Sequence, residues 1–253
     1  MTLLQVQSLC KTFGGVQAVH EVSFTLQAGE LLALIGPNGA GKSTTFNMVG
    51  GQLQPDHGRV LLNAENLVGL APRAIWRKGV GRTFQIAQTF ASLTVVENVQ
   101  MALLSRDQRI FSWWQRANAH RRPDALALLA QVDMAAQADR PCSELAYGDV
   151  KRVELAIALA HDPQLLLMDE PTAGMAPGER VALMQLTRQL AKARRMGVLF
   201  TEHSMDVVFG QADRVAVLVR GQLLAEGTPQ AIRDDARVQQ AYLGSGLVLE
   251  KQL

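Results

Sequence analysis

The chain has 253 residues, of which 48% are hydrophobic and 19% are charged, as in an ordinary globular protein. Lys and Arg total 25 against 23 Asp and Glu, and the net charge of +2 gives no electrostatic case for nucleic-acid binding, because groove-binding proteins usually carry a clustered basic excess. The two cysteines, Cys10 and Cys142, fit neither a disulfide framework nor a metal site, which suits a reducing cytosol.

The first third of the chain reads as short strands around one helix. Residues 4–9 and 22–26 alternate apolar and polar side chains, as half-buried strands do. Residues 31–35 are all apolar and are followed at once by glycine, which suits a strand covered on both faces. A helical pattern runs over 42–49 and stops at a glycine pair, and 58–62 reads as another strand.

The middle of the chain, residues 71–140, has a mostly helical pattern. Thr94 is the expected N-cap of a helix over 95–104, and Pro123 opens another helix that runs to residue 132. A further amphipathic helix covers 149–160. These helices predict an insertion between the strands of the first and last thirds.

Strands and helices alternate in the last third, and this alternation favours a mainly parallel sheet. The expected strands are 165–168, 198–201 and 215–219, and the expected helices are 178–193 and 204–211. No apolar run approaches the roughly 18 residues that would cross a bilayer, and the N-terminus lacks the basic and apolar regions of a signal peptide. We therefore expect one α/β core with a helical insertion, and any action at a membrane would require a partner.

One segment carries a specific chemistry. Gly36, four further residues and then Gly41-Lys42-Ser43 match the P-loop pattern, with an apolar strand before and a helix after. Glycines let the backbone curl so that N–H groups point at phosphate, and the helix adds the positive end of its dipole. Lys42 would reach the terminal phosphates and the Ser43 hydroxyl would ligate Mg²⁺, so the expected cofactors are ATP and Mg²⁺. The expected nucleotide-binding residues here are Gly36, Pro37, Asn38, Gly39, Ala40, Gly41, Lys42, Ser43 and Thr44.

Two adjacent acids follow the apolar run 165–168. Asp169 and Glu170 stand at the C-terminal end of an expected buried strand, where ligands bind in sheets of this kind. Asp169 is the expected outer or water-mediated partner of Mg²⁺, and Glu170, which projects in a different direction, can face an attacking water as general base. A strand ending in solvated acids is the alternative, and a P-loop in the same chain argues against it.

With both nucleotide motifs in place, the chain resembles the ABC-transporter ATPases over nearly its whole length. The resemblance implies an α/β fold: a P-loop NTPase core with a mainly parallel sheet, an N-terminal antiparallel β subdomain and an inserted helical subdomain. The resemblance also implies that residues 1–253 form one ATPase domain, with a core of about 1–85 and 161–253 and a helical part of about 86–160. The segment 81–85, Gly-Arg-Thr-Phe-Gln, resembles the family's Q-loop, so Gln85 would contact Mg²⁺ and the attacking water, with a polar surface residue as the alternative.

The segment 143–149, Ser-Glu-Leu-Ala-Tyr-Gly-Asp, resembles the signature motif of the family. The resemblance implies nucleotide contacts from Leu145, Ala146, Tyr147, Gly148 and Asp149. The segment departs from the commoner Leu-Ser-Gly-Gly-Gln: alanine replaces the serine whose hydroxyl would bond the γ-phosphate, tyrosine replaces a glycine and aspartate replaces glutamine. Gly148 remains, so backbone N–H groups can still meet phosphate, whereas the acid of Asp149 favours the helix start but weakens any direct attraction to phosphate.

Three more residues are identified by position. His203 follows an expected buried strand and resembles the family's switch histidine, which would bond the γ-phosphate and hold the attacking water with Glu170. Phe13 resembles the aromatic residue that stacks on adenine, with a core phenylalanine as the alternative. Ala176 stands where the family commonly has an aspartate that helps couple the two sites of a dimer, which leaves that coupling open.

Segments 81–85, 145–149, 173–175 and 241–244 together resemble the ATPases of bacterial branched-chain amino-acid importers. This resemblance implies a second ATPase subunit, identical or different, integral-membrane permease subunits, and indirectly a periplasmic binding protein that selects the solute. It implies a peripheral position on the cytoplasmic face of the inner membrane and no nucleic-acid partner. The alternatives are the ATPase of a urea or amide importer, that of a lipopolysaccharide exporter, and a soluble ABC ATPase acting on ribosomes or DNA.

Overall fold

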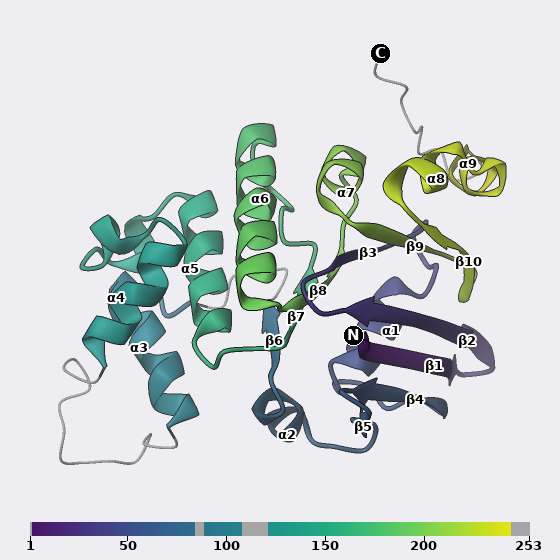
Figure 1. Ribbon diagram of the computed structural model, residues 1–253, viewed down its shortest axis with the longest axis horizontal. Helices are drawn as coiled ribbons and strands as arrows, with labels where there is room; N and C mark the ends of the chain where they lie inside the picture. Colours follow the sequence, from purple (N-terminus) through teal and green to yellow (C-terminus); the bar gives the residue numbers. More distant parts are fainter. Residues whose placement is uncertain (1, 84–88, 108–120, 244–253) are drawn as a thin grey trace.

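A six-stranded sheet lies at the centre of the part of the chain that the structure describes, residues 2–83, 89–107 and 121–243 (Figure 1). This computed structural model orders the strands β10-β9-β3-β8-β7-β6, with β9 to β6 parallel and β10 antiparallel to β9. The bounds are β3 Leu31–Ile35, β6 Val80–Thr83, β7 Leu165–Asp169, β8 Gly197–Thr201, β9 Arg214–Val219 and β10 Gln222–Gly227. The expectation of a mainly parallel sheet is confirmed.

The wholly apolar strand β3 is buried on both faces. Leu31, Ala33 and Ile35 pack in one hydrophobic cluster, which they share with the helices on that face of the sheet. Leu32 and Leu34 pack in a second cluster, which includes side chains of the N-terminal strands. Side chains alternate along a strand, so a strand between two cores needs apolar residues at every position. This is why residues 31–35 show no polar alternation.

A smaller antiparallel sheet forms the N-terminal part of the described chain. Its strands, in the order β2-β1-β4-β5, are β1 Thr2–Phe13, β2 Val16–Gln27, β4 His57–Leu62 and β5 Glu65–Asn66. The helix α1, Lys42–Val49, contacts β1 and β2 of this sheet and β7 of the central sheet. Strands β1 and β2 extend further than the alternation predicted, because Gly14 and Gly15 have φ of 53° and 85° and close a tight hairpin.

Among the described helices, α3, α4 and α5 pack against one another as a cluster. In Figure 1, α3, α4 and α5 gather on the left, where α5 contacts β6 of the central sheet, and α6 stands beside α5. Thr94 caps α3 as expected: its side chain accepts from the N–H of Glu97, and the Glu97 carboxylate accepts from the N–H of Thr94 at 2.8 Å. The bounds are α3 Val95–Arg106, α4 Arg122–Gln131, α5 Tyr147–Leu159, α6 Pro177–Arg194 and α7 Met205–Gln211.

Several short elements are not apparent from the sequence. Residues 80–83 lie in the region expected to be mostly helical, and that expectation is wrong there because β6 pairs in parallel with β7. The helices α2 Pro72–Arg77, α8 Pro229–Asp234 and α9 Ala236–Leu243 and the strands β5 and β10 were also missed. Each spans too few residues for periodicity to decide. No helix in the described ranges combines the length and hydropathy that a membrane span requires.

Candidate functional site

The phosphate loop, residues 36–44, joins the end of β3 to the start of α1. Gly36 has φ of 151°, and a Cβ there would lie 2.1 Å from the Leu218 carbonyl oxygen. Gly41 precedes α1 with φ of 95°, and a Cβ there would lie 2.5 Å from the Ala18 carbonyl oxygen. Neither contact is sterically possible, so both positions require glycine for the loop to curl between β9 and β2.

Lys42 opens α1 and is only 8% exposed. Its Nζ donates to the carbonyl oxygens of Gly36 at 2.6 Å and Pro37 at 3.0 Å. Burial lowers the pKa of Lys42, and the negative charge of Glu170 acts in the opposite direction. The first N–H groups of a helix have no intrahelical acceptor and lie at its positive end. The loop therefore combines an ammonium with backbone donors, which is the donor set that a polyphosphate requires.

Asp169 ends β7 and is paired in register with Thr201, the last residue of β8. The Thr201 hydroxyl donates to Asp169 Oδ1 at 2.7 Å, and Arg82 Nη2 lies 3.7 Å from Asp169 Oδ2. The side chain of Asp169 is 21% exposed, so the carboxylate keeps an accessible face. Carboxylate and hydroxyl oxygens are the ligands that Mg²⁺ prefers, and the exposed hydroxyl-bearing residue Ser43 lies in the first turn of the neighbouring helix α1. The residues present therefore fit a magnesium ion.

Glu170 leaves the strand in a strained conformation. Its φ is 47°, which is unusual for a residue with a side chain, and its N–H donates to both the backbone and the hydroxyl oxygen of Thr201. His203 Nε2 lies 3.0 Å from Glu170 Oε1. The structure thus brings together an acid and an imidazole that the sequence selected separately. A carboxylate held by an imidazole beside a phosphate loop can accept a proton from water.

Glu202 is a residue of this site that sequence reasoning missed. It is 3% exposed, and its carboxylate accepts from the Thr172 N–H at 2.9 Å, the Thr172 hydroxyl at 2.6 Å and the His203 N–H at 3.1 Å. These bonds join the segment after Glu170 to the segment that carries His203. The available signal was an acid placed directly after the buried strand β8, next to the expected switch histidine.

The signature segment, residues 143–149, lies at the start of α5. Ala146 is the N-cap and provides no side-chain bond, and the Asp149 carboxylate accepts from Gln137 Nε2 at 3.1 Å. Gly148 is buried, and a Cβ there would lie 3.2 Å from the Glu179 carboxylate. Within the described residues, no hydrogen bond or ion pair joins this segment to the phosphate loop. This segment and the phosphate loop are therefore not bonded to each other in the described part of one chain.

Of two further expected site residues, the structure describes Phe13 but not Gln85. Phe13 ends β1 and is 48% exposed, with Lys11 Nζ 5.6 Å from its ring centroid. This exposure excludes a core role and leaves a ring face open for stacking. Gln85 lies outside the described residues, since residues 84–88 are not part of them.

Comparison with known proteins identifies the family. A match to the ABC transporter family covers residues 19–173, and a match to the branched-chain amino acid ATP-binding cassette transporter family covers 222–247. The chain is 40% identical to the high-affinity branched-chain amino acid transport ATP-binding protein LivG of Salmonella typhimurium, over 96% of this chain and 98% of LivG. It is 37% identical to BraF of Pseudomonas aeruginosa, a protein with the same description, over the same two shares. It is 36% identical to the lipopolysaccharide export system ATP-binding protein LptB of Acidithiobacillus ferridurans, over 96% and 97%.

Solved structures agree with this assignment. An ATP-binding cassette of an ABC transporter in its ADP conformation matches with a TM-score of 0.86 and 30% identity, over 96% of this chain and 99% of that one. A dimeric cassette in a post-hydrolysis state, bound to ADP and phosphate, matches with a TM-score of 0.74 and 25% identity, over 90% and 99%. The chain belongs to the ABC transporter family, as one of its ATP-binding subunits that hydrolyse ATP to drive transport.

Proposed function

We propose that this chain hydrolyses ATP at the phosphate loop and the residues around Glu170, and that it thereby powers the import of branched-chain or other hydrophobic amino acids. The observation that carries the catalytic part is the 3.0 Å contact between Glu170 Oε1 and His203 Nε2, next to the buried Lys42. The descriptions of LivG and BraF support the solute class.

Each residue of the site has a proposed role in hydrolysis. The loop and Lys42 would hold the phosphates, while Ser43 and Gln85 would ligate Mg²⁺ and Asp169 would reach it through water. Mg²⁺, when bound, would neutralise charge on the phosphate oxygens. Glu170 would accept a proton from the attacking water, and His203 would orient that water and donate to the γ-phosphate. The exposed ring of Phe13 would stack on adenine.

A second ATPase subunit would complete the site. In this proposal the residues Leu145, Ala146, Tyr147, Gly148 and Asp149 of one subunit contact the nucleotide bound by the loop of the other. The lack of a hydrogen bond or ion pair between the two segments in the described part of one chain supports such an arrangement. We also propose that 1–253 acts as a single ATPase domain, with a core of about 1–85 and 161–253 and a helical part of about 86–160.

The membrane partners follow from the family. Permease subunits would bind this chain at the cytoplasmic face of the inner membrane, and a periplasmic binding protein would deliver the solute to them. The chain itself would select no solute. Export of lipopolysaccharide is the second candidate, because LptB is 36% identical over nearly the whole chain.

Reconstitution tests this proposal. The chain would be assembled in proteoliposomes with the permease subunits encoded beside its gene, and the vesicles would be given ATP inside and leucine-loaded binding protein outside. We expect leucine uptake that requires ATP and fails when Glu170→Gln replaces the parent chain. ATP hydrolysis without leucine uptake, together with ATP-dependent extraction of lipopolysaccharide, would instead establish the second candidate.

A further inference from the structure

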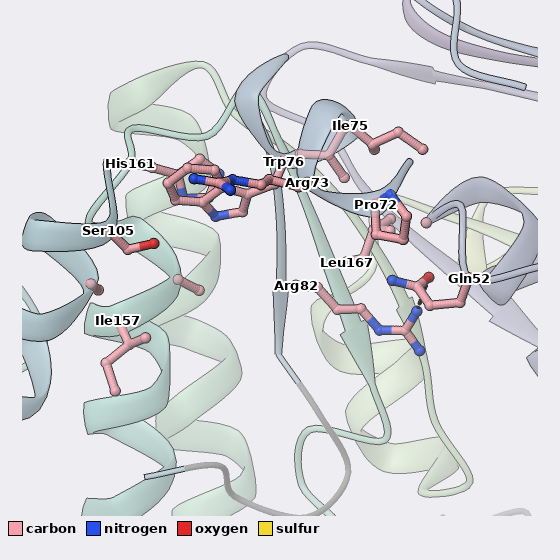
Figure 2. Close-up of a pocket in the computed structure, with 14 residues that line it drawn as sticks. Gln52, Pro72, Arg73, Ile75, Trp76, Arg82, Ser105, Ile157, His161 and Leu167 are labelled. Atoms are coloured by element: carbon pink, nitrogen blue, oxygen red, sulfur yellow. Dashed lines mark hydrogen bonds between the residues drawn. The ribbon is translucent and has the colours of Figure 1, made fainter. Parts of the chain in front are cut away.

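A pocket of about 370 Å³ opens between α2, β6, α3 and α5. It lies beside Asp169, the proposed partner of Mg²⁺, but outside the site described above. Figure 2 shows the rings of Trp76 and His161 near each other at one end, and Arg82 with Gln52 at the other. Trp76 and His161 have ring centroids 4.6 Å apart. Arg82 is the residue that links this pocket to the site, because its guanidinium lines the pocket and also reaches Asp169.

Three groups of α1 and its end hold the Arg82 guanidinium in place. Nη1 donates to Gln52 Oε1, Nη2 donates to Asn47 Oδ1 at 2.8 Å, and the guanidinium carbon lies 4.9 Å from the Phe46 ring centroid. Gly50 makes room for this arrangement, since a Cβ there would lie 3.1 Å from Nη1. The side chain is only 13% exposed, so its position is set by these contacts and not by solvent.

The guanidinium faces Oδ2 of Asp169, the carboxylate oxygen that Thr201 does not bond. Thr201 occupies Oδ1 with its hydroxyl, and Arg82 Nη2 lies 3.7 Å from Oδ2. Burial lowers the pKa of Arg82, and the charge of Asp169 raises it, as expected of an ion pair with little solvent around it. Asp169 is therefore oriented from both sides, by a neutral donor and by a cation.

We propose that Arg82, through its charge beside Asp169, sets how tightly the site binds its divalent cation. This inference rests on the proposed function of Asp169 as a partner of Mg²⁺. The fixed positive charge holds the carboxylate in place and opposes the charge of an arriving cation. Thr201 keeps its own bond to Oδ1, so removing the arginine charge leaves Asp169 oriented and takes away the repulsion. Arg82 therefore weakens metal binding and keeps it reversible.

The test separates metal binding from nucleotide binding. In a Glu170→Gln background, which prevents turnover, the dissociation constant of ATP is measured by calorimetry in EDTA and again in Mg²⁺. The constant in EDTA divided by the constant in Mg²⁺ reports the contribution of the metal alone, and a higher ratio means tighter metal binding. Arg82→Gln is expected to increase this ratio at least about tenfold, which is the effect of one unit charge about 6 Å from a divalent cation in bulk water and grows where solvent is scarce. Arg82→Lys keeps the charge and is expected to give a ratio close to the parent's.

Arg73→Gln is the matched control, because Arg73 lines the same pocket from the exposed face of α2 and is not paired with Asp169. An Arg82→Gln ratio equal to or below the parent's would overturn the proposal. If Arg82→Gln does not fold, Arg82→Met, which also removes the charge and keeps an unbranched side chain, must raise the ratio for the proposal to stand. A parent chain that binds no ATP in either buffer would refute the proposed function instead.

Discussion

The Glu170 carboxylate and the His203 imidazole lie 3.0 Å apart although 33 residues separate them in the chain. An ionised carboxylate only accepts hydrogen bonds, so Nε2 must carry the proton for this contact to be one. The pair stands where β7 and β8 end side by side, and the positive φ of Glu170 turns its carboxylate toward the neighbouring strand's continuation. The geometry gives each member a separate role, which mutation can separate.

Replacing Glu170 with glutamine removes the proton acceptor and keeps the shape of the side chain. Turnover of ATP should fall by at least about a hundredfold, since positioned acid–base groups contribute that much or more. ATP affinity should stay close to that of the parent, because the loop and Lys42 are untouched. Phosphate release and calorimetric ATP binding measure the two effects.

Lys42→Ala should affect ATP binding, whereas Glu170→Gln should affect turnover. Lys42→Ala removes the ammonium that is bonded to the carbonyls of Gly36 and Pro37, and it should lose ATP affinity. Equal ATP affinity in Lys42→Ala and the parent would place the phosphates away from the loop.

For Glu170→Gln, the contradicting result is normal turnover, which would show that another group takes the proton.

His203→Ala should impair hydrolysis more than binding. The imidazole is 45% exposed and contacts Glu170, so its loss should leave the fold and the loop intact and remove the group proposed to orient the attacking water. We expect a fall in kcat of about a hundredfold with an ATP dissociation constant within a few-fold of the parent's. A rise in the dissociation constant with unchanged kcat would assign His203 to nucleotide binding alone.

Ala146→Ser tests the altered signature through two readouts. Ala146 is an N-cap without a capping side chain, and serine there can accept from a backbone N–H of the first turn, which should raise stability by about 1 kcal/mol. If the hydroxyl also reaches the nucleotide of a second subunit, ATP-driven dimerisation in the Glu170→Gln background should strengthen. Greater thermal stability with unchanged dimerisation would mean that the hydroxyl serves only its own helix.

The stability of the fold should depend on pH through His161. Burial lowers its pKa from 6.5 to about 4, so the folded state keeps the neutral imidazole where the unfolded chain binds a proton. The unfolded state therefore takes up more protons between these two values, and stability is lost as pH falls from 6.5 toward 4. The loss is about 3 kcal/mol at most.

Urea denaturation at pH 7 and pH 5 measures this effect. His161→Gln should remove most of the difference between the two pH values, whereas His57→Gln, on the exposed start of β4, should preserve it. The same pH dependence in His161→Gln and the parent would assign the loss to other groups.

Local sequence patterns predicted those elements of the fold whose type follows from their own residues. The apolar run 31–35 predicted a doubly buried strand, 42–49 predicted α1 to the residue, and Thr94 predicted the start of α3. The short strand β6 was missed because its four residues become a strand through pairing with β7, which lies more than 80 residues later. No local pattern contains that information.

The candidate site divides in the same way. The loop, Asp169 and Glu170 were selected from the sequence because they follow expected buried strands, and His203 was selected because its position resembles that of the family's switch histidine. The 3.0 Å contact, the strained φ of Glu170 and the role of Glu202 depend on how β7 and β8 align, and alignment follows from packing of the whole sheet. The distance from Arg82 to Asp169 belongs to this second group.

The bonds of Glu202 have a consequence for how this protein can evolve. Its buried carboxylate relies on Thr172 for two of its donors, and a buried carboxylate without donors is strongly unfavourable. A substitution that removes the Thr172 hydroxyl alone leaves the acid with backbone donors only and without its shortest bond. A substitution of Glu202 alone leaves the buried hydroxyl and the Thr172 and His203 N–H groups without their acceptor. Related chains should therefore retain or replace positions 172 and 202 together, as one inherited pair.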